Sequence, residues 1–376
     1  MELETVRVPD CPPDRVSPGW KVELLDEGKP VSRLWIVDRI LRIRGARMSV
    51  GGISTVSTDD AYRGKGLAAR VMEAALGFME REGYDATLLH GIPDFYHRFG
   101  YSVCMPEYGL RIATPDAERA PDTLALRPSV ESDLSAIADI YNGGNAWRTG
   151  SAVRDPGTWK GFPRSAGWFM KPAVRVAVDG SGRVTGYVAF DDDPSLCRAS
   201  EAGGADGDAL GSILRFLARR ASELGKEEVH LALPPDHPLA LYARSFGCAA
   251  GIEYPRNGGF MGRIIRFGAF MEKLAEGLGR EPGPLLPEGS VALSTGHSAC
   301  RLAFRGGRGS LGEPPSPDAE GHARFGPGAF FRMAMGYRSA RDLQAAGELR
   351  AAADQLDLLE AWFPLRHATL YWADRF

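Results

Sequence analysis

A change of hydrophobic period marks residues 53–83, around which the rest of the chain is organised. Residues 53–58 form a β-branched run that is typical of the end of a strand. Gly83 is a typical helix stop. Between these limits the apolar residues take helical spacing, at Leu67, Val71, Ala75, Phe78 and Met79. The pattern predicts a strand, a glycine-rich turn and a helix.

The turn at residues 63–66 is suited to binding phosphate. A helix N-terminus leaves its first N–H groups without intrahelical partners, and such groups bind anions. Gly64 and Gly66 would let the backbone approach an anion closely, while Arg63 and Lys65 add positive charge. A phosphate site is therefore one interpretation of this turn, and a surface turn without a ligand is the other.

Three phosphate-binding motifs can be compared with this turn. The dinucleotide fingerprint tolerates Ala69 as its third small residue, but residues 87–91, about 20 positions on, contain no carboxylate for a ribose. A P-loop requires Gly-Lys-Ser or Gly-Lys-Thr, which does not occur in the sequence. The third motif, R/Q-x-x-G-x-G/A, is matched by Arg63, Gly66 and Ala68. Here the chain resembles the GNAT acetyltransferases, whose pyrophosphate loop has that signature.

A second motif extends this resemblance. After a predicted strand at residues 85–90, Tyr96 precedes Gly100 and Tyr101 as in the tyrosine-containing hallmark of the GNAT superfamily. The resemblance implies that Tyr96 protonates the departing thiolate, and that the strand before the turn pairs with the pantetheine arm. The alternative is that Tyr96 only packs under the sheet. The residues implied to bind acetyl-CoA are Val56, Ser57, Thr58, Arg63, Gly64, Lys65, Gly66, Leu67, Ala68 and Ala69.

Composition agrees with a cytoplasmic enzyme. The 376 residues suffice for two or three domains, with 25% charged and 44% hydrophobic residues. A net charge of −3 gives no reason to expect nucleic acid or an anionic membrane as partner. No apolar run approaches the roughly 18 residues of a membrane span, and no signal peptide precedes the first strand. The five cysteines and seven histidines show no metal-ligand spacing, so we expect reduced cysteines and no metal.

The N-terminus departs from the GNAT pattern. Residues 9–19 contain four prolines and cannot form a helix. Residues 21–26 and 31–37 are predicted as a strand pair about a Gly-Lys-Pro turn. A GNAT domain usually places two helices in this region, as one wall of the acceptor pocket. Either the pocket is unusually open, or another part of the chain covers it.

A second unit repeats the order of the first. It follows a polar linker at 114–123, and its predicted strands and helices include a helix at 209–224 and a strand at 229–233. Before that helix, residues 201–208 lack R-x-x-G-x-G/A and contain three carboxylates, which would repel an anion. Tyr242 also lies one residue further from its glycine than Tyr96 does. We therefore predict a degenerate acetyltransferase fold without cofactor, and one active site per chain.

The last unit follows a second linker, at 277–287. It combines strand-like runs with predicted helices at 328–335, 339–348 and 352–362. A degenerate central copy followed by a small α+β unit resembles the enhanced-intracellular-survival (Eis) acetyltransferases, whose last domain is similar to a sterol carrier protein. The resemblance implies a mixed α+β and α/β fold: an active GNAT domain at 1–118, a degenerate one at 122–272, and a sterol-carrier-like domain at 285–376. It also implies a homo-oligomer and points to a hexamer.

In the Eis family the chain's own terminal carboxylate acts as general base in the first domain, and Phe376 matches the terminal residue in type and position. An α-carboxylate titrates near about 3.5 and is ionised at pH 7, so it can accept a proton from an amine. Leu370, Tyr371 and Trp372 make the tail apolar, so we expect it to pack inward. Asp94 and Glu107 are the next candidates for the base.

These features together predict acetyl-CoA-dependent N-acetyltransfer to a primary amine of a small molecule or peptide. The amine would attack the thioester directly, with a backbone N–H near Val56 polarising the carbonyl. Tyr96 would protonate the leaving thiolate. The alternative is a non-catalytic CoA-binding or lipid-carrying protein, which the missing acceptor wall and the carrier-like last unit favour.

Overall fold

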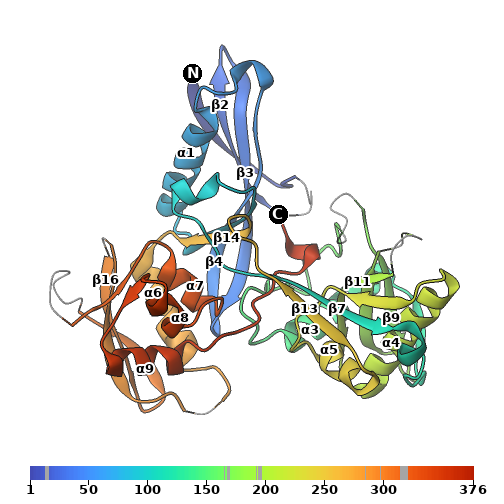
Figure 1. The fold of residues 1–376 in the computed structure, drawn as a ribbon. Helices are drawn as coiled ribbons and strands as arrows, with labels where there is room; N and C mark the ends of the chain where they lie inside the picture. The colour runs from blue at the N-terminus through green and yellow to red at the C-terminus, as the bar shows by residue number, and fades with distance from the viewer. Residues whose placement is uncertain are drawn as a thin grey trace.

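The computed structural model describes residues 1–12, 17–164, 166, 170–191, 193, 197–283, 285–296, 298–313 and 321–376. The strands of these residues form three sheets that are accompanied by helices (Figure 1). The mixed class predicted from the sequence is confirmed. Short 3₁₀ turns lie at Asp60–Tyr62 (η1), Tyr96–Phe99 (η2), Glu131–Asp133 (η3), Arg244–Phe246 (η4) and Trp372–Asp374 (η5).

The first sheet has the order β1-β2-β3-β4-β5-β14-β6. Its strands are β1 (Glu2–Val8), β2 (Gly19–Asp26), β3 (Lys29–Ile43), β4 (Ala46–Thr58), β5 (Ala86–Gly91), β6 (Ser102–Val103) and β14 (Gly259–Ile264). β4 and β5 are parallel, and α1 (Leu67–Arg81) connects them. All five apolar residues of the predicted helical stripe are buried, because α1 packs this stripe on the sheet. Within the described residues no helix lies between β1 and β4.

The second sheet has the order β13-β7-β12-β11-β10-β9-β8. Its strands are β7 (Glu107–Ala113), β8 (Ala125–Pro128), β9 (Ala173–Val178), β10 (Val184–Phe190), β11 (Arg198–Gly204), β12 (Glu228–Leu231) and β13 (Ala249–Glu253). Its helices are α2 (Thr114–Ala117), α3 (Leu134–Gly144), α4 (Gly207–Glu223) and α5 (Pro238–Ala243). β11 and β12 are parallel and connected by α4, so this sheet repeats the β4–α1–β5 arrangement.

The two sheets exchange strands. The first domain predicted from the sequence, 1–118, includes the whole of β7, but β7 pairs with β12 and β13 of the second sheet. The reason is burial: Leu110 and Ile112 alternate inward and join the apolar cluster of the second unit. In return, β14 pairs with β5 and β6 of the first sheet. The sheets therefore do not follow the predicted ranges 1–118 and 122–272.

Three other sequence expectations are corrected. Residues 114–123 are not a free linker, because they contain α2 and bury Thr114, Ala117 and Ala120. The first of the three predicted carboxylates before α4 does not lie at that helix, because Glu201 is a buried residue of β11. The predicted linker at 277–287 begins inside a helix that the sequence analysis missed, α6 (Phe267–Leu278).

The C-terminal unit has the strand order β17-β16-β15-β18-β19. These strands are β15 (Gly289–Thr295), β16 (Ser298–Arg305), β17 (Arg308–Gly312), β18 (Ala323–Phe325) and β19 (Leu349–Arg350). Its helices are α7 (Ala329–Ala334), α8 (Ala340–Ala345) and α9 (Ala353–Trp362).

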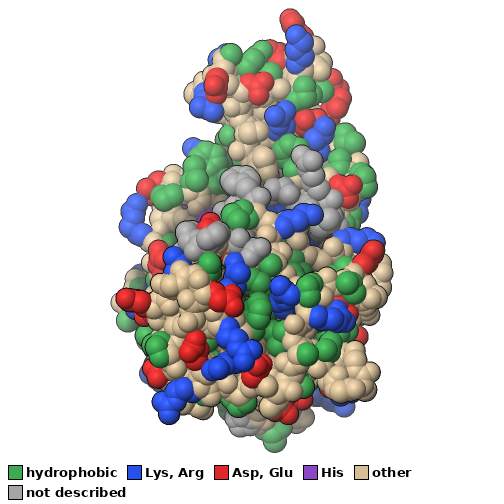
Figure 2. Space-filling model, turned by 90° about the vertical axis from the view of Figure 1, so that its right-hand side faces the viewer, with side chains coloured by type: hydrophobic (Ala, Val, Ile, Leu, Met, Phe, Trp, Pro, Cys, Tyr) green, Lys and Arg blue, Asp and Glu red, His purple; other side chains and the backbone are tan. Residues whose placement is uncertain are grey.

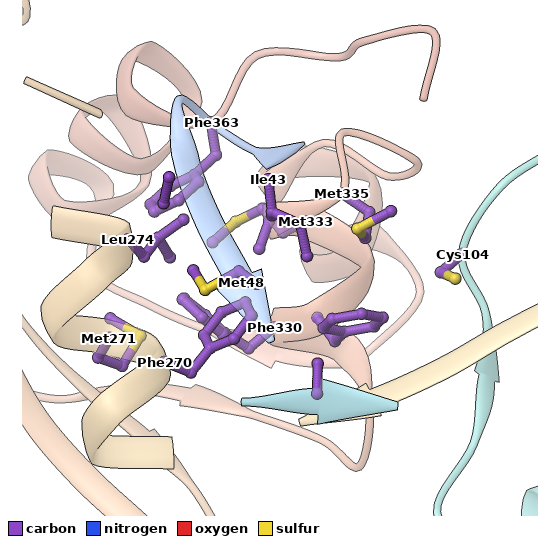
Figure 3. Packing of buried hydrophobic residues seen from close by; sticks show 14 of the residues in the cluster. Ile43, Met48, Cys104, Phe270, Met271, Leu274, Phe330, Met333, Met335 and Phe363 are labelled. Carbon is purple, nitrogen blue, oxygen red and sulfur yellow. The ribbon is translucent and has the colours of Figure 1, made fainter. Parts of the chain in front are cut away.

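The β3–β4 hairpin joins the three units. It extends from the first sheet toward both other units (Figure 1), and Leu41 forms a β-bridge with Ala152 of the second unit. Near its tip Ile43 and Met48 are fully buried in a cluster with Phe330 and other residues of the C-terminal unit (Figure 3). Since burying such side chains contributes about 1.5–3 kcal/mol each, the hairpin is a strong connection.

None of the described helices has both the length and the apolarity needed to span a bilayer. On the side of the molecule that carries the second unit, acidic and basic side chains are interspersed, and the N-terminal sheet projects above them (Figure 2).

Candidate active site

The predicted phosphate loop is an exposed turn before α1. Gly64 and Gly66 both have left-handed backbone conformations, with φ of 77° and 74°. A Cβ on either glycine would meet open space, so the outer side of the turn is accessible. Within the described part of the chain the N–H groups of residues 64–68 donate no hydrogen bond, whereas Ala69 donates to the Gly66 carbonyl at 3.1 Å. The turn therefore presents a row of available donors that ends before Ala69.

The two cations of the loop have weak partners. Arg63 pairs with Asp60 at 2.7 Å, but the two side chains are 72% and 87% exposed, so the pair contributes little. The Lys65 ammonium lies 4.7 Å from the ring centre of Tyr62. An anion in the turn can therefore attract both cations.

β4 offers an open edge beside this loop. Its pairing with β5 ends at Ile53, and beyond it, among the described residues, Ser54, Ser57 and Thr58 pair only with β3. Thr55 has φ of 51° and the β3 register shifts near it, so the strand is irregular where the β5 pairing stops. The predicted residues Val56, Ser57 and Thr58 lie on this edge, which has backbone groups available to another extended chain.

Tyr96 lies just after β5, in η2. Its ring centre is 4.8 Å from that of Phe95 and 6.2 Å from that of Tyr101. It covers Gly91, where a Cβ would lie 2.8 Å from the Tyr96 ring. Burial raises the pKa of Tyr96, so the hydroxyl is protonated near neutral pH. Its hydroxyl has no hydrogen-bond partner among the described residues, so it is free to donate to a ligand.

The C-terminal tail is buried, as the sequence predicted. Leu370 and Tyr371 are 1% exposed and Phe376 is 4% exposed. The Phe376 ring lies against β4 and occupies the space that a side chain at Gly52 would need. Phe376 belongs to the same apolar cluster as Leu88 of β5, whereas Tyr96 belongs to the cluster of Leu89. Leu88 and Leu89 point to opposite faces of the sheet, because successive residues of a strand alternate between the faces. Phe376 and Tyr96 therefore approach the β4–β5 pair from opposite faces.

The two alternative bases are already engaged. Asp94 accepts hydrogen bonds from Arg256 at 2.9 Å and Asn257 at 2.6 Å, on an exposed turn. Glu107 accepts a hydrogen bond from Arg375 at 2.8 Å. Both carboxylates therefore already have hydrogen-bond partners on the protein.

A cavity of about 660 Å³ lies beside the tail. β7, β12 and β13 of the second sheet line it together with His90 of β5 and Trp372 of the tail. His90 is two residues after Leu88 and so lies on the Phe376 side of the first sheet. The second unit and the tail therefore line a cavity beside the first sheet, on the side where His90 lies.

The sequence analysis missed His90 as a lining residue. Its ring stacks edge-on with Phe260 at 5.2 Å, and its Nε2 atom lies 3.9 Å from Glu107. Burial and the nearby Arg375 charge lower the pKa of His90. Glu107 and Phe260 lie beside His90 because the two sheets exchange strands. Such an exchange has no local sequence signal, so no motif could have identified His90 and its neighbours.

No group of three or more His, Cys, Asp or Glu side chains in the described ranges is arranged to hold a metal ion.

Comparison with protein families gives two matches. Residues 12–104 match the acetyltransferase (GNAT) domain family, and residues 292–371 match the sterol carrier protein domain family. Among curated proteins, the chain is 28% identical over 116 residues to the uncharacterized N-acetyltransferase YhbS of Escherichia coli (strain K12). That alignment covers 31% of this chain and 68% of YhbS.

Solved structures share the fold over nearly the whole chain. A GCN5-related N-acetyltransferase from Anabaena variabilis matches with a TM-score of 0.74 at 19% identity, covering 95% of this chain and 89% of that one. Eis1 from Mycobacterium abscessus matches with a TM-score of 0.65 at 17% identity, covering 95% and 90%. At these identities the likeness shows the fold.

Proposed function

We propose that this chain, which matches the acetyltransferase (GNAT) domain family over residues 12–104 and the sterol carrier protein domain family over residues 292–371, transfers acetyl from acetyl-CoA to a primary amine. The observation that carries the proposal is the accessible turn at residues 64–68 beside the open edge of β4. Backbone donors at a helix N-terminus suit a pyrophosphate, and an open strand edge suits the amide-containing pantetheine arm.

The predicted residues have separable roles. The turn from Arg63 to Ala68 would hold the pyrophosphate, and a backbone N–H near Val56 would polarise the thioester carbonyl. The amine nitrogen attacks the carbonyl carbon and the C–S bond breaks. Tyr96 gives its proton to the thiolate, and the terminal carboxylate of Phe376 takes the proton that the amine loses. The amine would approach through the cavity between His90, the second sheet and the tail.

Thiol release tests this function. The full-length protein, offered acetyl-CoA with polyamines, aminoglycosides and lysine peptides in turn, should release free thiol faster with at least one amine than with none. A matched reaction with Gly66→Glu should stay at the background rate. Release that no amine accelerates would contradict acetyl transfer to these classes.

A second candidate function is lipid carriage without catalysis. A cavity of about 440 Å³ lies where β14 meets the C-terminal unit, and Phe325, Phe330 and Phe331 line it. Binding of a fluorescent fatty acid by a protein that releases no thiol would favour this function. Amine-dependent thiol release would favour the first.

We infer two further properties. The described cysteines are all free and four of the five are buried, which suits the cytoplasm. We also propose a homo-oligomer, with a hexamer as the expected form. β1 is an edge strand on which Leu3 and Val6 are each 45% exposed, and such an edge can pair with a second copy. A monomer by light scattering at micromolar concentration would contradict the association.

A further inference from the structure

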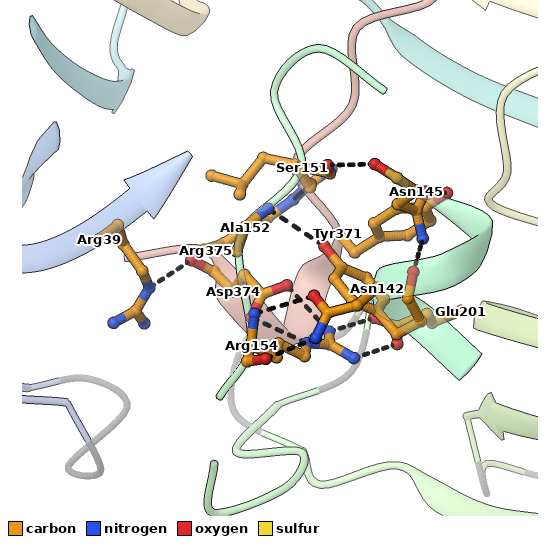
Figure 4. Close-up of polar contacts among 12 residues, drawn as sticks. Arg39, Asn142, Asn145, Ser151, Ala152, Arg154, Glu201, Tyr371, Asp374 and Arg375 are labelled. Atoms are coloured by element: carbon orange, nitrogen blue, oxygen red, sulfur yellow. Dashed lines mark hydrogen bonds and ion pairs between the residues drawn. The ribbon is translucent and has the colours of Figure 1, made fainter. Parts of the chain in front are cut away.

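The second unit holds the C-terminal tail through a buried ion network (Figure 4). The guanidinium of Arg154 donates to both oxygens of Glu201, at 2.6 and 2.7 Å, and to both oxygens of Asp374, at 3.2 and 2.9 Å. The three side chains are 1%, 1% and 6% exposed. One planar cation therefore joins β11 of the second unit to the tail with two bidentate pairs.

The guanidinium has little freedom to move. It stacks on the ring of Tyr141 at 3.6 Å and lies 4.3 Å from the ring centre of Trp159. Tyr187 donates to Glu201 at 2.7 Å and fixes the far carboxylate. Because both partners of Arg154 are anions, removing the cation would leave two buried charges without compensation, which is strongly destabilising.

The tail beyond Asp374 is held at each position. The Asp374 carbonyl accepts a hydrogen bond from Arg39 of β3 at 3.2 Å. Arg375 bonds to Glu107 of β7 at 2.8 Å and stacks on Trp372 at 3.6 Å. Phe376 then lies against Gly52 of β4. Only two residues separate the Arg154 network from the end of the chain, so a shift at Asp374 is transmitted to the terminal carboxylate.

We propose that Arg154 is a positioning residue for the terminal carboxylate, and that the second unit therefore serves the first as the anchor of its base. The inference rests on the proposed function, in which that carboxylate accepts the proton of the amine. It gives a role to the buried Glu201 of β11, the strand equivalent to β4, in a unit that lacks a phosphate loop. Displacements near 1 Å matter in positioned catalysis, so a loosened tail should slow the reaction.

The test uses Asp374→Asn in the full-length protein, because this change removes the tail's charge and leaves the Arg154–Glu201 pair intact. We expect kcat to fall at least tenfold, while KM for acetyl-CoA stays within twofold. The matched control is Asp133→Asn, which breaks another bidentate arginine pair of the same unit, with Arg127 at 2.6 and 2.8 Å, away from the tail. Its kcat should stay within twofold of the wild type.

A second measurement does not depend on activity. Carboxypeptidase should release the terminal phenylalanine from Asp374→Asn at least tenfold faster than from the wild type or from Asp133→Asn. Arg154→Lys, which keeps one charge but cannot form two bidentate pairs, should lie between wild type and Asp374→Asn in both measurements. Unchanged release of phenylalanine, or faster release with unchanged kcat, would overturn the positioning role.

The proposed function fails in a different way. If it is wrong, the wild type shows no amine-dependent thiol release, whatever the state of the tail. If only the positioning role is wrong, the wild type is active and deletion of Phe376 inactivates it, but Asp374→Asn keeps its kcat.

Discussion

The two sheets share a parallel strand pair connected by one helix, but the N-termini of those helices differ. α1 follows Gly66, whose left-handed backbone supplies no side-chain cap. α4 follows Asp206, whose carboxylate accepts the N–H of Ala209 at 2.9 Å. A carboxylate in this position satisfies a donor that a phosphate would need and repels the phosphate's charge. The same topology therefore gives a helix N-terminus without a side-chain cap in one unit and a capped one in the other.

The edges of the equivalent strands β4 and β11 also differ, since the first is open and the second is occupied by a side chain. Beyond Ile53 the edge of β4 is open, whereas in the second unit the carbonyl of Ala202 on β11 lies 3.1 Å from Nε2 of His237. The other ring nitrogen accepts the N–H of Leu239 at 3.1 Å, so Nε2 carries the proton and donates it to Ala202. A side chain thus fills the place that is open in the first unit. In the second unit one carboxylate and one imidazole thus occupy the helix N-terminus and the strand edge that are unoccupied in the first.

The largest effect that we expect is the loss of CoA binding when the turn before α1 is blocked. Gly66→Glu puts a charged side chain into the phosphate turn at a residue with positive φ, so we expect CoA binding to disappear. Titration calorimetry should find one CoA site per chain in the wild type and none in the variant.

Gly182→Glu is the matched control, since Gly182 has φ of 83°, faces open space and lies on a turn of the second unit. Its CoA affinity should equal that of the wild type. Two CoA sites per chain, or unchanged affinity in Gly66→Glu, would contradict the difference between the units.

The next largest effect is a fall in kcat when Tyr96, which follows β5, loses its hydroxyl; Tyr242, which follows β12, is the equivalent residue of the second unit. Tyr96→Phe keeps the buried ring and removes the proton, so kcat should fall by roughly 10²- to 10⁴-fold, as expected for a general acid. Affinity for CoA and the unfolding temperature should barely change. Tyr242→Phe, the equivalent change in the second unit, should leave kcat unaltered. A fall of less than about threefold in Tyr96→Phe would assign Tyr96 to packing.

A smaller effect is expected at the end of the chain. Deleting Phe376 retracts the terminal carboxylate by about 3.4 Å, and acetylation should fall at least tenfold while CoA affinity stays intact. A short C-terminal tag should act in the same way, because it replaces the carboxylate by an amide.

An N-terminal tag of the same sequence is the control. Gly52→Ala and Gly51→Ala provide a sharper pair, since a Cβ at Gly52 meets Phe376 whereas one at Gly51 meets Met79 of α1. The first should lower kcat, and the second should lower stability. Full activity with a C-terminal tag would show that another group is the base.

The sequence predicted the parts of the fold that rest on local pattern. The stripe of α1, the turn at Gly64 and Gly66 and the apolar tail each appear as predicted, because each depends on neighbouring residues. The exchange of β7 and β14 could not be predicted, because the alternation of apolar and polar residues in a strand does not specify which strand it pairs with. The Arg154 network was missed for the same reason. Glu201 and Asp374 are 47 and 220 positions from Arg154, and no motif spans such distances.

The smallest effect that we expect is a pH dependence of the free energy of unfolding that arises from His237, which occupies the strand edge of the second unit. Burial lowers the pKa of His237 to about 3, whereas an unfolded histidine titrates near about 6.5. Below pH 6.5 the unfolded chain binds a proton that the folded one does not, so the free energy of unfolding falls as pH falls, until about pH 3. His237 should therefore cost about 2 kcal/mol of stability between pH 7 and pH 5. His237→Asn, which can still cap α5, should remove that part of the pH dependence in denaturant titrations, and His97→Asn on an exposed turn should not. If His237→Asn kept the full pH dependence, the imidazole would not be the group that closes this edge.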